Sequence, residues 1–206
     1  MDHINMLIKR YPVLLECKNE IEATVNCIVS MHKNGGKLLL CGNGGSAADC
    51  EHISGELLKG FLLPRPLRTD QLCGIEEPIR SSLQQGIAAI PLPSFSALMT
   101  AFANDISSEN AFAQLVFALG KSNDVLLCIS TSGNAKNVCN AAKTAKALGI
   151  KTVALTGASG GELSKLCDIK IKAPEYDTFK IQELHLPIYH AICAEVEEIL
   201  YGGRKE

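Results

Sequence analysis

Four side chains suited to proton transfer or metal binding stand at helical spacings in two distant parts of the chain. His52 and Glu56 are four positions apart, so a helix would present both on one face, one turn apart. Gln182 and His190 are eight positions apart, which on a regular helix separates them by about 80° around the axis and about 12 Å along it. Imidazole and carboxylate groups act as general acids and bases and as ligands of divalent metals. The alternative for any single histidine is a packing or surface role.

Pro187 and His185 bear on the second pair. Pro187 lies between Gln182 and His190, and a helix kink at the proline would shorten the distance between them. His185 is nearer to Gln182 along the chain but lies on a different helix face from His190. The sequence leaves open whether His185 joins the site.

Two loops rich in glycine and small polar residues each follow a short apolar run. The first spans residues 42–46, after KLLLC, and the second spans residues 130–134, after DVLLCI. Glycine lets a backbone turn tightly and approach a ligand, and the helix that follows offers free N–H groups to an anion. Helix capping would explain one such loop, but two at corresponding strand ends predict a phosphate site. Its candidate residues are Asn43, Gly44, Ser46, Ser130, Thr131, Ser132 and Asn134.

The same loops argue against a nucleotide cofactor. Neither ends in the GK[ST] of a nucleotide-binding P-loop. GNGGSA matches the G-x-G-x-x-A pattern of dinucleotide-binding proteins, but that pattern requires an acidic residue about 20 positions later, at the end of a second strand. The corresponding segment is LLPRPLRTD, in which no strand is expected. The sequence therefore predicts neither ATP, GTP nor NAD.

The bulk properties are those of an ordinary globular chain. Its 206 residues are 47% hydrophobic and 20% charged, with a net charge of −2, which excludes a disordered chain and gives no attraction for nucleic acid or an anionic membrane. No apolar run reaches the roughly 18 residues of a membrane span. The N-terminus lacks the basic and apolar stretches of an export signal. We therefore expect a cytoplasmic protein.

The nine cysteines fit the same compartment. No two are closer than nine positions, so no CxxC pair is present for zinc or redox chemistry. Several lie in apolar runs such as LLLCG and VLLCIS. They are expected to be buried, reduced thiols.

Hydrophobic periodicity predicts helices that alternate with short apolar strands. Residues 1–35 form an N-terminal helical segment that a glycine pair ends; its apolar positions at helical spacing are Leu14, Ile21, Val25, Ile28 and Val29. The expected strands are KLLLC, GIAAIPL, DVLLCIS, KTVALTG and CDIKIKAP, and the later helices cover residues 46–61, 94–105, 109–120, 135–149 and 179–200. Continuous apolar strands between helices are typical of a parallel sheet covered on both faces. The fold class is therefore α/β: a three-layer, doubly wound, mainly parallel five-stranded sheet flanked by helices.

Residues 62–86, which we name the insertion, interrupt this alternation. The segment carries three prolines and mixed charges. A long connection of this kind is typically a surface loop, a lid or an oligomer contact, and a plain solvated connection is the alternative. Residues 1–206 are otherwise expected to form a single domain.

The two loops and the last helix resemble the sugar isomerase (SIS) domain, and within it the bacterial phosphoheptose isomerases. LLLCGNGGSAADCEH is similar to the first phosphate-side loop and helix of that family, DVLLCISTSGNAKNV with KTVALTG to the second, and KIQELHLPIYH to its closing helix. The resemblance covers nearly the whole chain except the insertion. It implies the SIS fold and an enzyme that interconverts sedoheptulose 7-phosphate and a heptose phosphate.

The resemblance also implies roles for single residues. The family's base and acid correspond to Glu56 and His190. The ligands of the zinc ion that several members bind correspond to His52, Glu56, Gln182 and His190. The phosphate-binding hydroxyls correspond to Ser46, Ser130, Thr131 and Ser132, and Gln182 also stands among the substrate-binding positions. A related non-enzyme with this fold, which associates with a replication initiator, lacks the glutamate and the final histidine, whereas this chain keeps both.

Three positions depart from the family pattern at the sugar end of the pocket. Ala135 replaces a serine that follows the asparagine of STSGN, and Gly60, beside Lys59, replaces an arginine. Phe95 stands where the family has an aspartate that contacts the sugar. With the insertion, these changes leave the identity of the phosphosugar open, while the acid–base residues are kept.

The resulting prediction is a phosphosugar aldose–ketose isomerase that works through an enediol. The expected partners are a phosphorylated sugar and, because the first and last helices of the family pack between subunits, further copies of the chain in a homotetramer. No nucleic acid or membrane partner is expected. Two alternatives stay open: an isomerase for another phosphosugar, such as a shorter ketose phosphate or an amino sugar phosphate, and a non-catalytic module that binds phosphosugars or proteins.

Overall fold

Five apolar runs form one parallel sheet in the computed structural model, which describes residues 2–71 and 74–203. All four strand pairs are parallel, in the order β2-β1-β3-β4-β5. The strands are β1 (Leu38–Cys41), β2 (Ala89–Pro91), β3 (Val125–Ile129), β4 (Lys151–Gly157) and β5 (Ile169–Ala173). Each expected strand is present, and the predicted α/β class is confirmed. The second strand is only three residues long, which suits an edge strand that ends at a proline.

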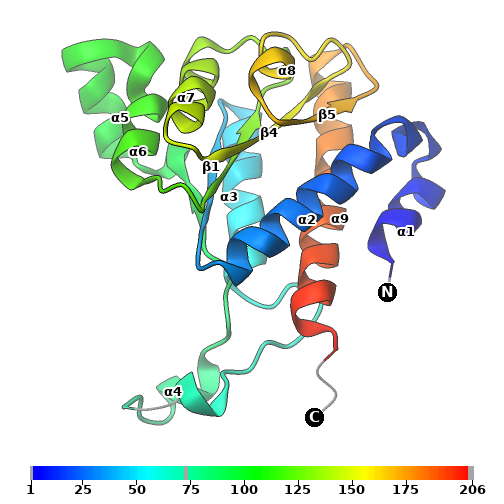
Figure 1. Cartoon of the computed structure of the whole chain (residues 1–206), viewed down its shortest axis with the longest axis vertical. Helices are drawn as coiled ribbons and strands as arrows, with labels where there is room; N and C mark the ends of the chain where they lie inside the picture. Colours follow the sequence, from blue (N-terminus) through cyan, green and yellow to red (C-terminus); the bar gives the residue numbers. More distant parts are fainter. Residues whose placement is uncertain (1, 72–73, 204–206) are drawn as a thin grey trace.

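Helices cover both faces of the sheet (Figure 1). They are α1 (His3–Arg10), α2 (Lys18–Lys33), α3 (Gly45–Leu58), α4 (Ile79–Ser82), α5 (Ser96–Phe102), α6 (Ala111–Leu119), α7 (Lys136–Ala147), α8 (Leu163–Leu166) and α9 (Thr178–Tyr201). Short 3₁₀ or π turns lie at Pro12–Cys17, Thr69–Gln71, Leu92–Ser94, Ala103–Ser107 and Ser108–Asn110. Among the described residues, no helix combines the length and apolar character needed to cross a bilayer.

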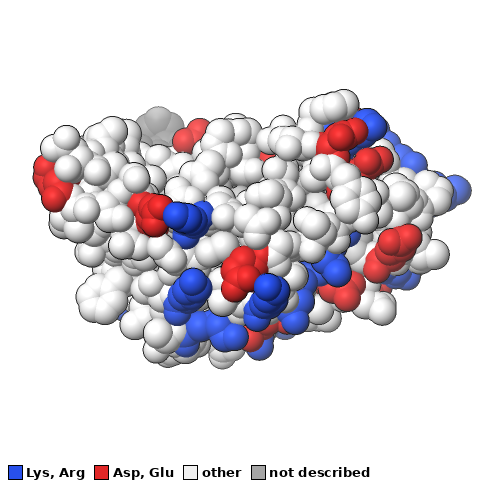
Figure 2. All heavy atoms as spheres, turned by 90° about the horizontal axis from the view of Figure 1, so that it is seen from above, with Lys and Arg blue, Asp and Glu red and all other residues white. Residues whose placement is uncertain are grey.

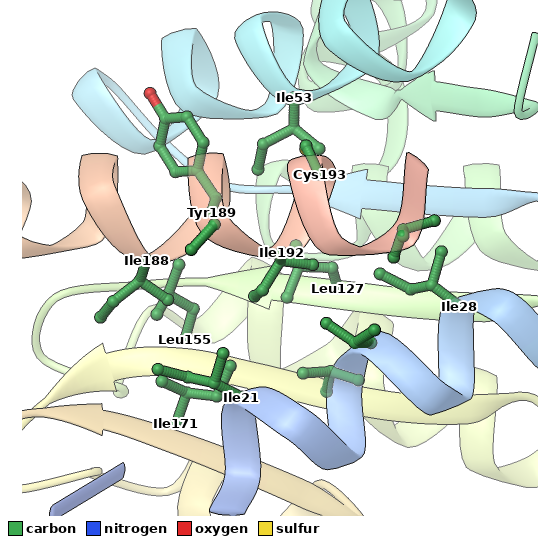
Figure 3. Close-up of a cluster of buried hydrophobic side chains, with 14 of the residues drawn as sticks. Ile21, Ile28, Ile53, Leu127, Leu155, Ile171, Ile188, Tyr189, Ile192 and Cys193 are labelled. Atoms are coloured by element: carbon green, nitrogen blue, oxygen red, sulfur yellow. The ribbon is translucent and has the colours of Figure 1, made fainter. Parts of the chain in front are cut away.

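Alternate strand residues face two apolar cores. Leu38 and Leu40 point into the core formed with α1, α2, α3 and α9, whereas Leu39 and Cys41 point into the core formed with α6 and α7. This division follows from the strand, in which successive side chains point to opposite faces. Figure 3 shows the first core, where Ile188 of α9 lies over the sheet beside side chains of α2.

The N-terminal segment is helical in two parts rather than in one. A 3₁₀ turn at Pro12–Cys17 separates α1 from α2. Tyr11, which precedes the proline, has φ −128° and ψ 77° and is outside the helical region, because proline disfavours a helical conformation of the residue before it. The five apolar positions predicted to face the core are nevertheless all buried.

The insertion leaves the sheet and returns to it. Figure 1 shows its short helix α4 far below the strands. Within its described residues, an isolated antiparallel bridge joins Pro66 to Gln84. Cys73 lies outside the described residues, so its predicted state stays untested.

Candidate active site

The two glycine-rich loops lie side by side where the sheet changes direction. β1 and β3 are neighbours in register, with Cys41 opposite Cys128, so the loops that follow them start at the same edge. The strand order places this point at the switch between the two halves of the sheet, where open α/β folds bind ligands. Asn43 of the first loop and Asn137 of α7 exchange two amide hydrogen bonds of 2.9 Å, which join the two loop regions directly.

The first loop presents its polar atoms at the N-terminus of α3. Asn43 and Gly44 are exposed, and Ser46 in the first turn is buried. Figure 1 shows α3 and α9 starting at the upper edge of the molecule, where the strands end, and running downward together. A helix N-terminus at this edge offers free N–H groups to an anion.

The second loop is held by backbone contacts that depend on glycine. Gly133 has φ +67°, and a Cβ there would lie 2.2 Å from the carbonyl oxygen of Gly160, so no other residue fits. The Asn134 side chain accepts from the backbone N–H of Glu162 at 2.9 Å and donates to the carbonyl oxygen of Ser132 at 3.1 Å. Asn134 thus uses its side chain to shape the loop. The side chains of this loop that can still donate to a phosphate are the hydroxyls of Ser130, Thr131 and Ser132.

The face of the molecule that is seen from above in Figure 2 carries charges of both signs. On the face seen in Figure 2, lysine and arginine side chains lie among acidic ones, and most of the surface is uncharged. A phosphate at this edge would therefore depend on backbone N–H groups and hydroxyls more than on a field of positive charge.

His52, Glu56 and His190 meet between α3 and α9. Nε2 of His52 lies 3.2 Å from Oε1 of Glu56 and 3.3 Å from Nε2 of His190, and one ligand atom from each residue fits within 4.8 Å of the other two. Lone pairs on atoms this close repel one another unless a proton or a metal cation lies between them. The Glu56 side chain is 17% exposed and that of His52 44%, so a small molecule can reach the cluster.

The environment favours neutral imidazole at His190. Burial, and then the neighbouring His52, lower the pKa of His190, while Glu56 opposes the shift. A neutral imidazole can accept a proton or bind a metal through Nε2. A neutral His190 is therefore suited near pH 7 to both predicted roles of the cluster, proton transfer and metal binding.

Gln182 lies at the other end of the α3–α9 contact. A Cβ at Gly45 would lie 2.6 Å from Nε2 of Gln182, which places the amide beside the first turn of α3. Gly45 precedes His52 by seven residues, about two helical turns. α9 runs on through Pro187 as one helix. The structure therefore brings Gln182 to the first loop, and its predicted role as a metal ligand remains a prediction.

Several neighbours of the cluster were not found from the sequence. The hydroxyl of Tyr189 lies 3.0 Å from Nδ1 of His52 and 3.3 Å from Oδ1 of Asp49. The Phe61 ring packs at 5.7 Å from the ring of His190. Asp49 precedes His52 by three residues, so helical spacing could have identified it; the two aromatic residues became visible only once α9 and the turn after α3 were placed.

The residues next to two of the family departures have partners on α3. Nζ of Lys59 lies 3.8 Å from Oε2 of Glu56, so a cation stands beside Glu56 even though Gly60 replaces the arginine. Phe95 is partly exposed, and Ser94 before it donates to Glu51 of α3 at 2.8 Å.

His185 lies apart from the cluster, in the core. Its ring is fully buried, and its Nε2 lies 3.2 Å from the carbonyl oxygen of Thr156 at the end of β4, to which the Nε2–H tautomer donates. Nδ1 has no hydrogen-bond partner within the described ranges. Burial lowers the pKa of His185 to about 4.

We expect His185 to weaken the fold in mild acid. An unfolded histidine titrates near 6.5 and the folded His185 near 4, so its contribution is complete above about pH 6.5 and is lost as the pH falls toward 4. By pH 5 the loss is about 2 kcal/mol. Urea unfolding at pH 7.5 and pH 5 should show a smaller pH effect for His185→Gln than for the wild type. An equal effect in both chains would mean that other groups cause the acid sensitivity.

Comparison with known proteins confirms the resemblance seen in the loops and the last helix. Residues 4–157 match the SIS domain family. The chain is 44% identical over 175 residues to phosphoheptose isomerase 2 of Campylobacter jejuni, a match that covers 85% of this chain and 78% of that protein. Solved phosphoheptose isomerases from Francisella tularensis and Neisseria gonorrhoeae, both 31% identical, give TM-scores of 0.78 and 0.72 and cover 92% and 94% of this chain and 91% of each of theirs. The chain therefore belongs to the SIS domain family, alongside these phosphoheptose isomerases.

Proposed function

We propose that the chain catalyses aldose–ketose isomerisation of a phosphosugar through an enediol, with sedoheptulose 7-phosphate as the first substrate to test. The observation that carries the proposal is the meeting of Glu56 and His190, from two different helices, at one cluster. The relatives are named as phosphoheptose isomerases. A non-catalytic sugar-binding module would have no need of these two proton-transfer groups.

The loops would hold the phosphate. Backbone N–H groups at the start of α3 and the hydroxyls of Ser46, Ser130, Thr131 and Ser132 are the proposed donors. Fixing the phosphate, which does not react, uses binding energy far from the reacting carbons to position them. Gln182, beside Gly45, lies between the first loop and the cluster and would contact the sugar chain.

Glu56 and His190 would move the protons. In the open sugar, the Glu56 carboxylate removes the proton alpha to the carbonyl and later returns it to the neighbouring carbon. Neutral His190 accepts the proton of the hydroxyl on the alpha carbon and donates it to the former carbonyl oxygen, and in ring opening it moves a proton from the anomeric hydroxyl to the ring oxygen. A positioned acid or base typically contributes about 10²–10⁴-fold to the rate. Lys59 would counter the negative charge beside Glu56.

The cluster fits a zinc ion by its donor set. Two imidazole nitrogens and a carboxylate oxygen are ligands of catalytic zinc sites, which keep a further position open for a substrate or water. We propose His52, Glu56 and His190 as ligands, which leaves the fourth position open; Gln182, the fourth ligand that the sequence predicts, lies beside Gly45 at the other end of the α3–α9 contact. When bound, zinc supplies Lewis acidity that polarises a carbonyl oxygen.

We also propose that residues 1–206 form a single SIS domain that assembles into a homotetramer. A groove of about 360 Å³ runs between α1, α9 and Phe61 and reaches His190. Met6 is 53% exposed and Leu186 is 42% exposed along it, so a second copy would bury apolar surface beside the site. Sedimentation velocity at micromolar concentration should give four times the mass of one chain.

A cytoplasmic location is part of the same proposal. All eight cysteines among the described residues are free thiols, and seven of them are buried. Reduced cysteines are typical of proteins in a reducing compartment.

The deciding experiment measures metal content and turnover of the purified protein together. Isomerisation of sedoheptulose 7-phosphate should be observed and should increase when zinc is supplied to metal-depleted protein. Zinc binding without turnover would direct the assay to pentulose and amino sugar phosphates. Absence of turnover on the whole panel would overturn the isomerase and favour the binding module.

A further inference from the structure

A tyrosine connects the cluster to a carboxylate that stands behind it. Oη of Tyr189 lies 3.0 Å from Nδ1 of His52 and 3.3 Å from Oδ1 of Asp49. Tyr189 comes from α9 and is 2% exposed, whereas Asp49 and His52 are three residues apart on α3. Figure 3 shows the Tyr189 hydroxyl directed from α9 toward α3. The three groups form a chain that ends at the cluster.

The Tyr189 hydroxyl has one proton and two neighbours. With a neutral His52 imidazole, this allows two hydrogen-bond arrangements. If Tyr189 donates to Asp49, its oxygen accepts a hydrogen bond from His52, whose Nδ1 must then carry the proton. If Tyr189 instead donates to Nδ1, the proton of neutral His52 sits on Nε2, which faces Glu56 and His190. Only the first arrangement leaves the Nε2 lone pair free for a metal ion.

Asp49 selects the first arrangement. A hydrogen bond to an ionised carboxylate is stronger than one to a neutral imidazole. The half-buried Asp49 carboxylate therefore accepts the hydrogen bond of the phenol.

We propose that Tyr189 and Asp49 are positioning residues that hold His52 in the Nδ1–H form and so present Nε2 to a divalent metal. This inference rests on the metal site proposed above. Neither residue touches the substrate or the metal in this scheme. Their effect passes through the imidazole, by fixing both its tautomer and the orientation of its ring.

Removing the phenol hydroxyl should weaken metal binding. Tyr189→Phe keeps the ring and its packing but leaves Nδ1 without an acceptor, so His52 can turn or adopt the Nε2–H tautomer. Loss of such an outer partner typically lowers metal affinity about 10–100-fold. Asp49→Asn should weaken zinc binding in the same way, and the double variant should add little, because both substitutions break one chain of contacts.

Zinc affinity of the purified protein, measured by competition with a chromophoric chelator, tests this directly. Tyr201→Phe is the matched control, since it removes a hydroxyl from the same helix, next to His32 rather than the cluster; its affinity should equal that of the wild type. Nitrogen-15 NMR of the imidazoles should show a protonated Nδ1 at His52 in the wild type and a loss of this preference in Tyr189→Phe.

The outcomes separate this inference from the function beneath it. Equal zinc affinity in wild type and Tyr189→Phe would overturn the positioning role and leave the metal site standing. A wild type that binds no zinc would overturn the metal site and this inference with it, and turnover would then decide the isomerase alone. If Tyr201→Phe also bound zinc more weakly than the wild type, the loss of affinity would come from general loosening of α9, and the positioning role of Tyr189 would be overturned.

Discussion

Replacing Glu56 by glutamine is expected to lower the turnover of the phosphosugar by at least about 10²-fold, the contribution of one positioned base. Glutamine has nearly the same shape but cannot accept the carbon-bound proton. The side chain is three-quarters or more buried and stands within contact of His52 and Lys59, so a nearby water cannot readily take its place. The loss should appear in kcat more than in KM, because the phosphate loops are untouched.

Exchange of the substrate proton in D₂O isolates this step. The wild type should incorporate deuterium at the carbon alpha to the carbonyl, and Glu56→Gln should not. Glu51→Gln is the control on the same helix, where the carboxylate accepts a hydrogen bond from Ser94; its kcat should stay within about twofold of the wild type, as for substitutions away from reacting groups.

Glu56 is also a proposed zinc ligand, so the metal must be controlled. Both variants are assayed at saturating zinc, with the bound metal measured in the same sample. A Glu56→Gln chain that is fully loaded and inactive supports the role as base. Full activity with deuterium incorporation would disprove it and move the proton transfer to another group.

The strands were predictable because their chemistry is local. The central strands β1 and β3 are runs of apolar residues buried on both faces, the pattern that parallel sheets covered by helices require, whereas the edge strand β5 alternates isoleucine with exposed lysine. Pro12 indicates a break in the N-terminal helix, because proline disfavours a helical conformation of Tyr11 before it. The regular apolar spacing after the proline nevertheless favoured one continuous helical segment. β2 ends at Pro91 and lies at the edge of the sheet. The position of a strand within the sheet is not contained in the local sequence pattern.

The candidate site was predictable only where its residues share one helix. His52 and Glu56 are four apart on α3, and their proximity follows from helical geometry. Their meeting with His190 depends on α3 and α9 lying side by side and running the same way, so that Gly45 faces Gln182 two turns before His52 faces His190. The same alignment explains why Gln182 reaches the first loop.

Arg65 anchors the start of the insertion, and Arg65→Met is expected to destabilise the fold by about 3–5 kcal/mol, the cost of breaking a buried ion pair from one side. Its side chain is fully buried, with Nε 2.7 Å from Oε1 of Glu197 and Nη1 2.8 Å from the carbonyl oxygen of Leu57. The guanidinium also lies over the Tyr201 ring. Methionine fills similar space but leaves the Glu197 carboxylate charged and buried.

Urea unfolding should reveal this as a lower midpoint with an unchanged slope. Arg68→Met is the matched control three residues later: Arg68 is exposed and pairs with exposed Asp70, and such pairs contribute about 0–1 kcal/mol. Adding Glu197→Gln to Arg65→Met should recover part of the loss, because an amide oxygen at the Oε2 position can still accept from the backbone N–H groups of Leu62 and Leu63 without a buried charge, at the cost of the acceptor for Phe61. If Arg65→Met were as stable as Arg68→Met, the ion pair would not be what fastens the insertion to α9, and the burial of Glu197 would have to be stabilised by those three N–H groups alone.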